Sequence, residues 1–123
     1  MGENHYYGKN TRQQAREAVY YVLVYRPLIR YWTKKLGLTH LTVKTEPISR
    51  DQVMFPKDIS KEDRYFVGVA IEGTTVTITH DRDLTEEDIL HELLHIANPG
   101  KDDKEGEDWI NAETTKLIKQ KEQ

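Results

Sequence analysis

The stretch DILHELLHIANPG, residues 88–100, places two histidines four positions apart, with a glutamate directly after the first. Four residues advance an α-helix by slightly more than one turn, so His91 and His95 would project from one face and could bind one metal ion. Glu92 would flank that ion and could take a proton from water. The stretch therefore predicts a helix that carries two metal ligands and a general base.

Signals at both ends delimit this helix. Thr85, with Asp88 three residues later, has the pattern of a capping box, in which side chain and backbone bond reciprocally at a helix start. Pro99 disfavours the helical conformation at the residue before it, and Gly100 can turn the chain. We therefore expect the helix to begin near Thr85 and to end at the sequence ANPG.

The segments before this helix predict further helix and strand. A capping-box pattern at Thr11 opens a long run with apolar residues at helical spacing, which Pro27 should kink or divide and Gly37 should end. LTVKTE (41–46) alternates like a short strand, and residues 47–63 predict a loop. Two strand-like runs in residues 64–80, separated at Glu72-Gly73-Thr74, predict a hairpin.

After the charged loop that follows ANPG, the sequence KEGEDWINAETTKLIK (104–119) predicts a last helix. The expected fold class is α+β, with an N-terminal helix, a short sheet with a hairpin, the HExxH helix and a C-terminal helix. At 123 residues the chain fits one domain, spanning 1–123, with flexible ends at 1–10 and 119–123.

Composition limits the chemistry and the location. The chain has no cysteine, so any metal must be held by histidine and carboxylate groups. The longest apolar run, Val19 to Ile29, contains Arg26 and Pro27 and is too short to span a bilayer, and no signal-peptide stretch opens the sequence. We expect a soluble, cytoplasmic protein, and the sequence leaves its oligomeric state open.

Charge is divided unevenly along the chain. Residues 1–50 hold nine Lys/Arg against three Asp/Glu, whereas residues 51–123 hold nine against eighteen, so a net charge of +6 is followed by one of −9. We expect the two halves to attract each other as an internally paired, solvated surface. The alternative is that the basic half faces nucleic acid or an acidic partner, which is possible but not favoured.

A catalytic zinc site generally takes three protein ligands, so a third is needed beside His91 and His95. No histidine follows His95, and the search falls on the carboxylates of the last helix. Glu107 is the favoured ligand because it shares a helical face with apolar residues such as Ile110 that should pack against the HExxH helix. Glu113 is the main rival, and Glu105 or Asp108 fit this face less well.

For other residues near the motif the sequence allows more than one interpretation. Asn111, one turn after Glu107, either orients a histidine by a hydrogen bond or is a surface residue. His80 could donate to a developing oxyanion, but a turn residue is the simpler interpretation, and we do not assign it to the site. Trp109 and Trp32 are expected in the core.

HELLH followed by EDWIN resembles the zincin metallopeptidases of the gluzincin kind, over about residues 64–118. The order of elements is similar to that of minimal soluble gluzincins. The resemblance implies that His91, His95 and Glu107 bind Zn²⁺, that Glu92 activates water, and that Asn111 supports a ligand. Only eleven residues separate His95 from Glu107, which is short for the larger members, and a large substrate-binding subdomain is absent.

The expected function is zinc-dependent hydrolysis of peptide bonds in a peptide or protein substrate. An edge strand, Thr74 to His80, is expected to hold an extended peptide by backbone hydrogen bonds. Two alternatives stay open: a metal-stabilised regulatory module without turnover, and a nucleic-acid-associated protein. C-terminal segments of some minimal gluzincins block the cleft, so a latent form is a further alternative.

Overall fold

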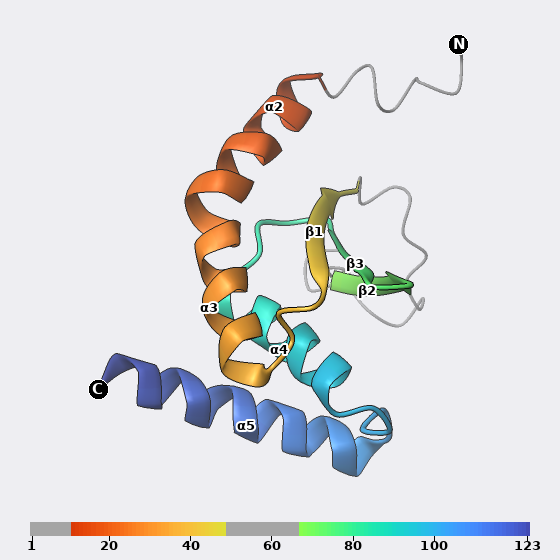
Figure 1. Ribbon diagram of the computed structural model, residues 1–123, viewed down its shortest axis with the longest axis vertical. Coiled ribbons are helices and arrows are strands. Elements are labelled where there is room, and N and C mark those ends of the chain that lie inside the picture. Colours follow the sequence, from red (N-terminus) through yellow and green to blue (C-terminus); the bar gives the residue numbers. More distant parts are fainter. Residues whose placement is uncertain (1–10, 49–66) are drawn as a thin grey trace, which may run out of the picture.

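The computed structural model describes residues 11–48 and 67–123, and it has the predicted α+β architecture (Figure 1). The predicted loop 47–63 lies almost wholly outside the described residues, as do residues 1–10. The elements are, in order, α2 (Thr11–Tyr20), the π-helical turn η2 (Tyr21–Tyr25), α3 (Arg26–Leu36), β1 (Thr42–Pro47), β2 (Val67–Glu72), β3 (Thr75–His80), α4 (Glu86–Ala97) and α5 (Lys104–Glu122).

The N-terminal helix is divided where Pro27 predicted it. Proline lacks an amide hydrogen and crowds the carbonyl four residues earlier, and the wider turn η2 ends directly before α3, with the N–H of Arg26 donating to the carbonyl of Tyr21. Gly37 ends α3 in the left-handed conformation, with φ 73°, as predicted. The capping side chain of Thr11 lies outside the described residues.

The three described strands form one sheet in the order β1-β3-β2. β2 and β3 make the predicted antiparallel hairpin, in which Gly73 has the positive φ, 63°, required at the first central position of a type II′ turn. β1 pairs parallel with β3. The prediction of β3 as an edge strand was therefore wrong, because β3 has a neighbour on each side and β2 is an edge of the described sheet.

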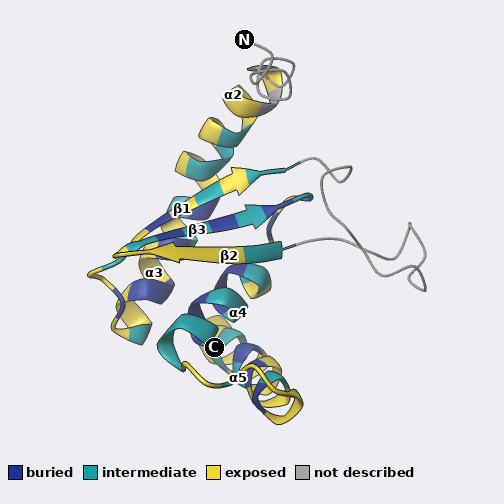
Figure 2. Ribbon diagram, turned by 90° about the vertical axis from the view of Figure 1, so that its right-hand side faces the viewer, coloured by how far each residue is buried: buried dark blue, intermediate teal, exposed yellow. Residues whose placement is uncertain are grey.

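The core lies between the sheet and helices α3 and α4, and α5 packs against α4 (Figures 1 and 2). Trp32, Ile78 and Leu93 are fully buried there. Trp109 was predicted in the core, but 39% of it is exposed, and the Nζ of Lys101 lies 4.8 Å from its ring centroid. Its position on α5 faces away from α4, since the buried face of that helix carries Ile110 and Thr114.

The last helix runs further than predicted. α5 extends to Glu122 and so includes most of residues 119–123, which were expected to be a flexible end. Lys121 near this end forms an ion pair with Glu86 at the start of α4. None of the helices within 11–48 and 67–123 combines the length and apolar character needed to cross a membrane.

The basic and acidic halves meet in pairs between α2 and the segment around β3. Arg16 donates two hydrogen bonds to Asp83, at 3.1 and 2.9 Å, on the surface. Deeper in the fold, the Nε2 of buried His80 lies 3.0 Å from the Glu17 carboxylate, which also accepts a 2.7 Å hydrogen bond from Thr45. The Arg16–Asp83 pair agrees with the expected attraction between the two halves, whereas the Glu17–His80 pair joins them with the opposite signs.

The Glu17–His80 pair predicts pH-dependent stability. Burial raises the pKa of Glu17 and lowers that of His80, but their mutual hydrogen bond and further hydrogen bonds outweigh it, so the Glu17 pKa falls below 4.5 and the His80 pKa rises above 6.5. The His80 contribution is complete below its unfolded pKa and is lost as pH rises through its folded pKa. The Glu17 contribution is complete above its unfolded pKa and is lost as pH falls through its folded pKa.

We therefore expect Glu17→Gln to destabilise the protein most between about pH 4.5 and 6.5. The loss in free energy of unfolding should be larger at pH 5.5, where both partners are charged, than at pH 8, above the ordinary pKa of histidine. Urea unfolding at the two pH values measures this difference, with Glu87→Gln as a control at an exposed carboxylate. An equal cost at both pH values would contradict the pairing.

Candidate metal centre

The start of α4 is fixed by the predicted capping box. The Asp88 amide donates to the Thr85 hydroxyl at 3.1 Å, and the Thr85 amide donates to the Asp88 carboxylate at 2.8 Å. Arg82 donates two hydrogen bonds to the same carboxylate, at 2.7 and 3.0 Å. Burial raises the pKa of Asp88, yet these hydrogen bonds hold it below its ordinary value, so the carboxylate stays ionised and tied to the helix start.

One face of α4 is buried and the opposite face carries the motif histidines. Ile89, Leu90, Leu93 and Leu94 are buried, which fixes the rotation of the helix about its axis. His91 and His95 are half-buried on the other side, with ring centroids 4.9 Å apart. The predicted sharing of a face by the two rings is confirmed.

Helix α5 brings a carboxylate to this pair. Its first turn is capped by Asp103, which accepts a 2.7 Å hydrogen bond from the Gly106 amide, and Ile110 and Thr114 form its buried face. One oxygen of Glu107 lies 2.8 Å from the Nε2 of His91, and the other lies 3.2 Å from the Nε2 of His95. A carboxylate oxygen is therefore within hydrogen-bonding distance of each imidazole.

The rival carboxylate lies elsewhere. Glu113 is half-buried and lies 3.8 Å from the Nζ of Lys116, on its own helix. Of the His, Asp and Glu side chains that the structure describes, His91, His95 and Glu107 form a group whose ligand atoms all lie within 4.8 Å of one another, and neither Glu113, Glu105 nor Asp108 belongs to that group. The face of α5 that was predicted to pack against α4, with Glu107 on it, is the face that does so.

The donor set fits zinc. Imidazole nitrogens bind zinc at about 2.0–2.1 Å and carboxylate oxygens at about 2.0–2.2 Å, so two ligands in tetrahedral geometry lie roughly 3.4 Å apart. The Glu107 oxygens already lie 2.8 and 3.2 Å from the two Nε2 atoms. The ligand atoms of all three residues lie within 4.8 Å of one another. Three protein ligands of this kind leave a position for water or substrate, as in catalytic sites.

Two side chains near the group make no close contact with its histidines. The Nδ1 of His95 lies 3.7 Å from an Asp102 oxygen, a distance too long for a direct hydrogen bond. Asn111 is exposed, and among the described residues its side chain makes no hydrogen bond to either histidine. The structure thus does not show the ligand-supporting bond considered for Asn111.

A cleft of about 560 Å³ opens beside His91, between α4, α5 and the start of β2. His91 and Glu92 both line it, together with Asn111 and Val67; the other lining residues are Glu87, Asp88, Thr114 and Thr115. Burial, with the neighbouring Glu107 and Asp88 charges, raises the pKa of Glu92 to about 7 against the opposing effect of His95. Glu92 is therefore a half-buried proton-accepting group at the wall of the cleft.

His80 lies outside this group and has a structural role. Its Nδ1 is 2.6 Å from the Arg82 carbonyl oxygen and its Nε2 is 3.0 Å from Glu17, so both ring nitrogens are engaged. The ring of Tyr25 packs edge-on against it at 5.8 Å. The possible oxyanion role is not supported by this placement.

Gly106 was not selected as a functional residue from the sequence. It is buried in the first turn of α5, and a Cβ placed on it would lie 2.5 Å from the backbone of Lys101. Only glycine lets the α4–α5 connection pass so close to the helix that carries Glu107. The available signal was a glycine within a predicted helix, where it costs about 1 kcal/mol relative to alanine.

We expect Gly106→Ala to lower the free energy of unfolding by about 1–3 kcal/mol, because the clash with backbone outweighs the better helix propensity of alanine. Urea unfolding measures the change. The control is Ala112→Gly at an exposed position of α5, where propensity alone should cost about 1 kcal/mol. A stabilised Gly106→Ala protein would show that the close approach to Lys101 has no energetic importance.

Comparison with known proteins adds no relative: no family model matches the chain, and neither the curated proteins nor the solved structures gave a match. The resemblance to gluzincins therefore stays a prediction that depends on the motif. The functional argument depends on the geometry of the group formed by His91, His95 and Glu107 and on the cleft that His91 and Glu92 line.

Proposed function

We propose that the protein is a zinc-dependent metallopeptidase that hydrolyses peptide bonds in the cleft between α4 and α5. The observation that carries the proposal is the convergence of His91, His95 and Glu107 from two helices, with ligand atoms within 4.8 Å of one another. These three residues would hold the zinc ion. A bound zinc ion lowers the pKa of water and polarises a carbonyl group, which are the two requirements of peptide hydrolysis.

Glu92 would act as the general base. It follows the first ligand on α4 and lines the same cleft, and burial with nearby negative charge raises its pKa to about 7. A carboxylate with an elevated pKa takes a proton and returns it readily near neutral pH. Glu92 would thus remove a proton from the attacking water and deliver it to the leaving amine.

Substrate would bind as an extended chain along β2 rather than β3. β2 is an edge of the described sheet, most of its residues are exposed (Figure 2), and Val67 at its start lines the cleft. The backbone groups on the outer side of an edge strand can pair with a peptide. Such binding relies on main-chain contacts and favours an unstructured segment of a protein as substrate.

The test is cleavage of an unstructured protein such as casein by the zinc-loaded protein, followed by gel electrophoresis and mass spectrometry. We expect cleavage that stops on chelation and returns when one equivalent of zinc is added. Stoichiometric zinc without any cleavage would favour the metal-stabilised regulatory module, in which the metal has only a structural role.

A further inference from the structure

The outer side of α3 carries a row of cations that the proposed peptidase site does not use. Arg26, Arg30 and Lys34 are spaced four residues apart, so they follow one side of the helix at intervals of about 6 Å. We call these three residues the basic ridge. Among the ion pairs of the described residues none includes a member of the ridge, whereas Arg16, Arg82 and Lys121 are all paired with carboxylates.

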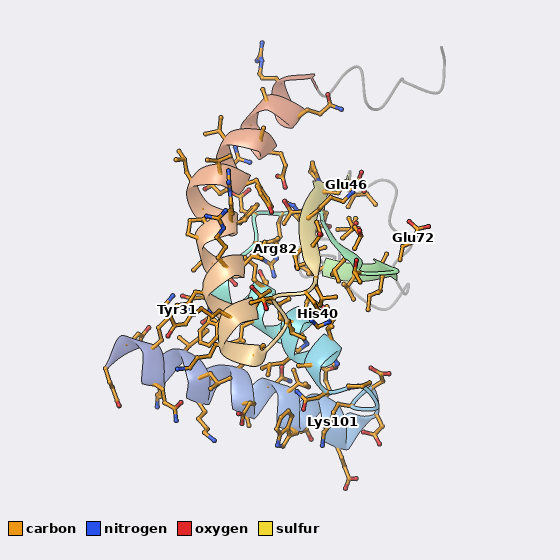
Figure 3. All side chains as sticks on the ribbon, viewed as in Figure 1. Tyr31, His40, Glu46, Glu72, Arg82 and Lys101 are labelled. Carbon is orange, nitrogen blue, oxygen red and sulfur yellow. The ribbon has the colours of Figure 1, made fainter. Side chains whose placement is uncertain are left out.

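A hollow lies on each side of the basic ridge. The first, of about 530 Å³, lies between the ridge and β1 and includes Tyr21, Leu41 and Val43. The second, of about 620 Å³, includes Val22, Pro27 and Tyr31. Figure 3 shows Tyr31 on the side of α3 away from the sheet. No Asp or Glu of the described chain lines either hollow, so both combine positive charge with apolar and aromatic walls.

One donor of the ridge lacks an acceptor. The Nε of Arg26 is buried and has no hydrogen-bond partner among the described residues. A buried N–H group without an acceptor is costly, and the cost is larger when the group is charged. The described residues therefore leave this donor of the basic ridge unsatisfied.

We propose that the basic ridge binds single-stranded nucleic acid. A row of cations at regular intervals matches a polyanion with repeated phosphates, and a single phosphate could contact only part of it. The apolar hollows with Tyr21 and Tyr31 would receive unstacked bases, as stacking platforms do in single-strand binders. In a duplex the bases are stacked on one another, so they could not enter these hollows.

This inference goes beyond the proposed peptidase function and does not depend on it. The basic ridge belongs to α3 and its hollows to α3, η2 and β1, whereas the metal centre belongs to α4 and α5. Residues 1–50 carry a net charge of +6, and the ion pairs described above neutralise only part of it. This charge is consistent with such a surface.

The experiment is fluorescence anisotropy with a labelled 20-nucleotide oligothymidylate, using the full chain over a range of salt concentrations. We expect Arg30→Gln/Lys34→Gln to weaken binding at least about tenfold and to reduce the slope of log K against log salt by roughly 1.4, since each phosphate contact in a single strand contributes about 0.7. Both positions are exposed, so the fold should persist, and circular dichroism checks it.

The matched control is Lys104→Gln/Lys116→Gln, which removes the same charge from exposed positions on α5 and should leave binding within about twofold. Equal losses in the two double variants would overturn the proposal, as would failure of the wild-type chain to bind the oligothymidylate. Tighter binding of a duplex, or of polyglutamate of equal charge, would replace single-stranded nucleic acid with that ligand and would also overturn it.

Discussion

Glu92→Gln is expected to lower the rate of peptide hydrolysis by about 10²- to 10⁴-fold, the usual contribution of a general base, while zinc content stays at one per chain. Glutamine has nearly the shape of glutamate but cannot accept the proton from water. Glu92 is not among the three grouped ligand residues, so its replacement should leave metal binding intact. The decrease should appear in kcat more than in KM, because the proton transfer belongs to the chemical step.

The measurement is the initial rate of casein cleavage for both proteins at equal zinc occupancy, determined by atomic absorption. Glu87→Gln is the matched control, because Glu87 lies five residues earlier on the same helix, lines the same cleft and is exposed. Its rate should remain within a fewfold of wild type. Unchanged hydrolysis by Glu92→Gln would remove Glu92 from the role of base.

Glu107→Ala is expected to weaken zinc binding by at least about tenfold, whereas Glu113→Ala should leave it unchanged. Glu107 lies 2.8 Å from His91 and 3.2 Å from His95, while Glu113 faces Lys116 on its own helix. Both substitutions remove one carboxylate from α5, so they match in charge and in helix context. Competition with a chromophoric chelator gives the affinities.

His91→Ala serves as a reference for the loss of one ligand in the same assay. We expect the Glu107 and His91 variants to behave alike, with loss of stoichiometric zinc. If Glu113→Ala weakened zinc binding more than Glu107→Ala, α5 would have to be rotated about its axis when the metal binds. The contacts of its buried residues, Ile110 and Thr114, would then have to change as well.

Most of the centre could be predicted because its signals are local. The capping box at Thr85 and the proline at 99 delimit α4, and the four-residue spacing of the histidines fixes their common face. The choice of Glu107 also required a prediction of which face of the last helix is apolar. The burial of Ile110 agrees with that prediction. In each case a few neighbouring residues determine the conformation.

The remaining features depend on contacts between distant segments. Nothing in the alternation of β3 distinguishes a central strand from an edge, because the difference lies in its parallel pairing with β1. The exposure of Trp109 and the close approach of Lys101 to Gly106 follow from how the α4–α5 connection folds back. The basic ridge has a visible spacing in the sequence, but its hollows form only when η2 and β1 lie beside α3.

The most direct test of the metal centre is a crystal structure of the protein with zinc, using anomalous scattering at the zinc absorption edge. We expect one strong peak at about 2.0–2.1 Å from the Nε2 atoms of His91 and His95 and at about 2.0–2.2 Å from an oxygen of Glu107. A peak bound by other residues, or no peak while Glu107 keeps its close contacts with both imidazoles, would contradict the account.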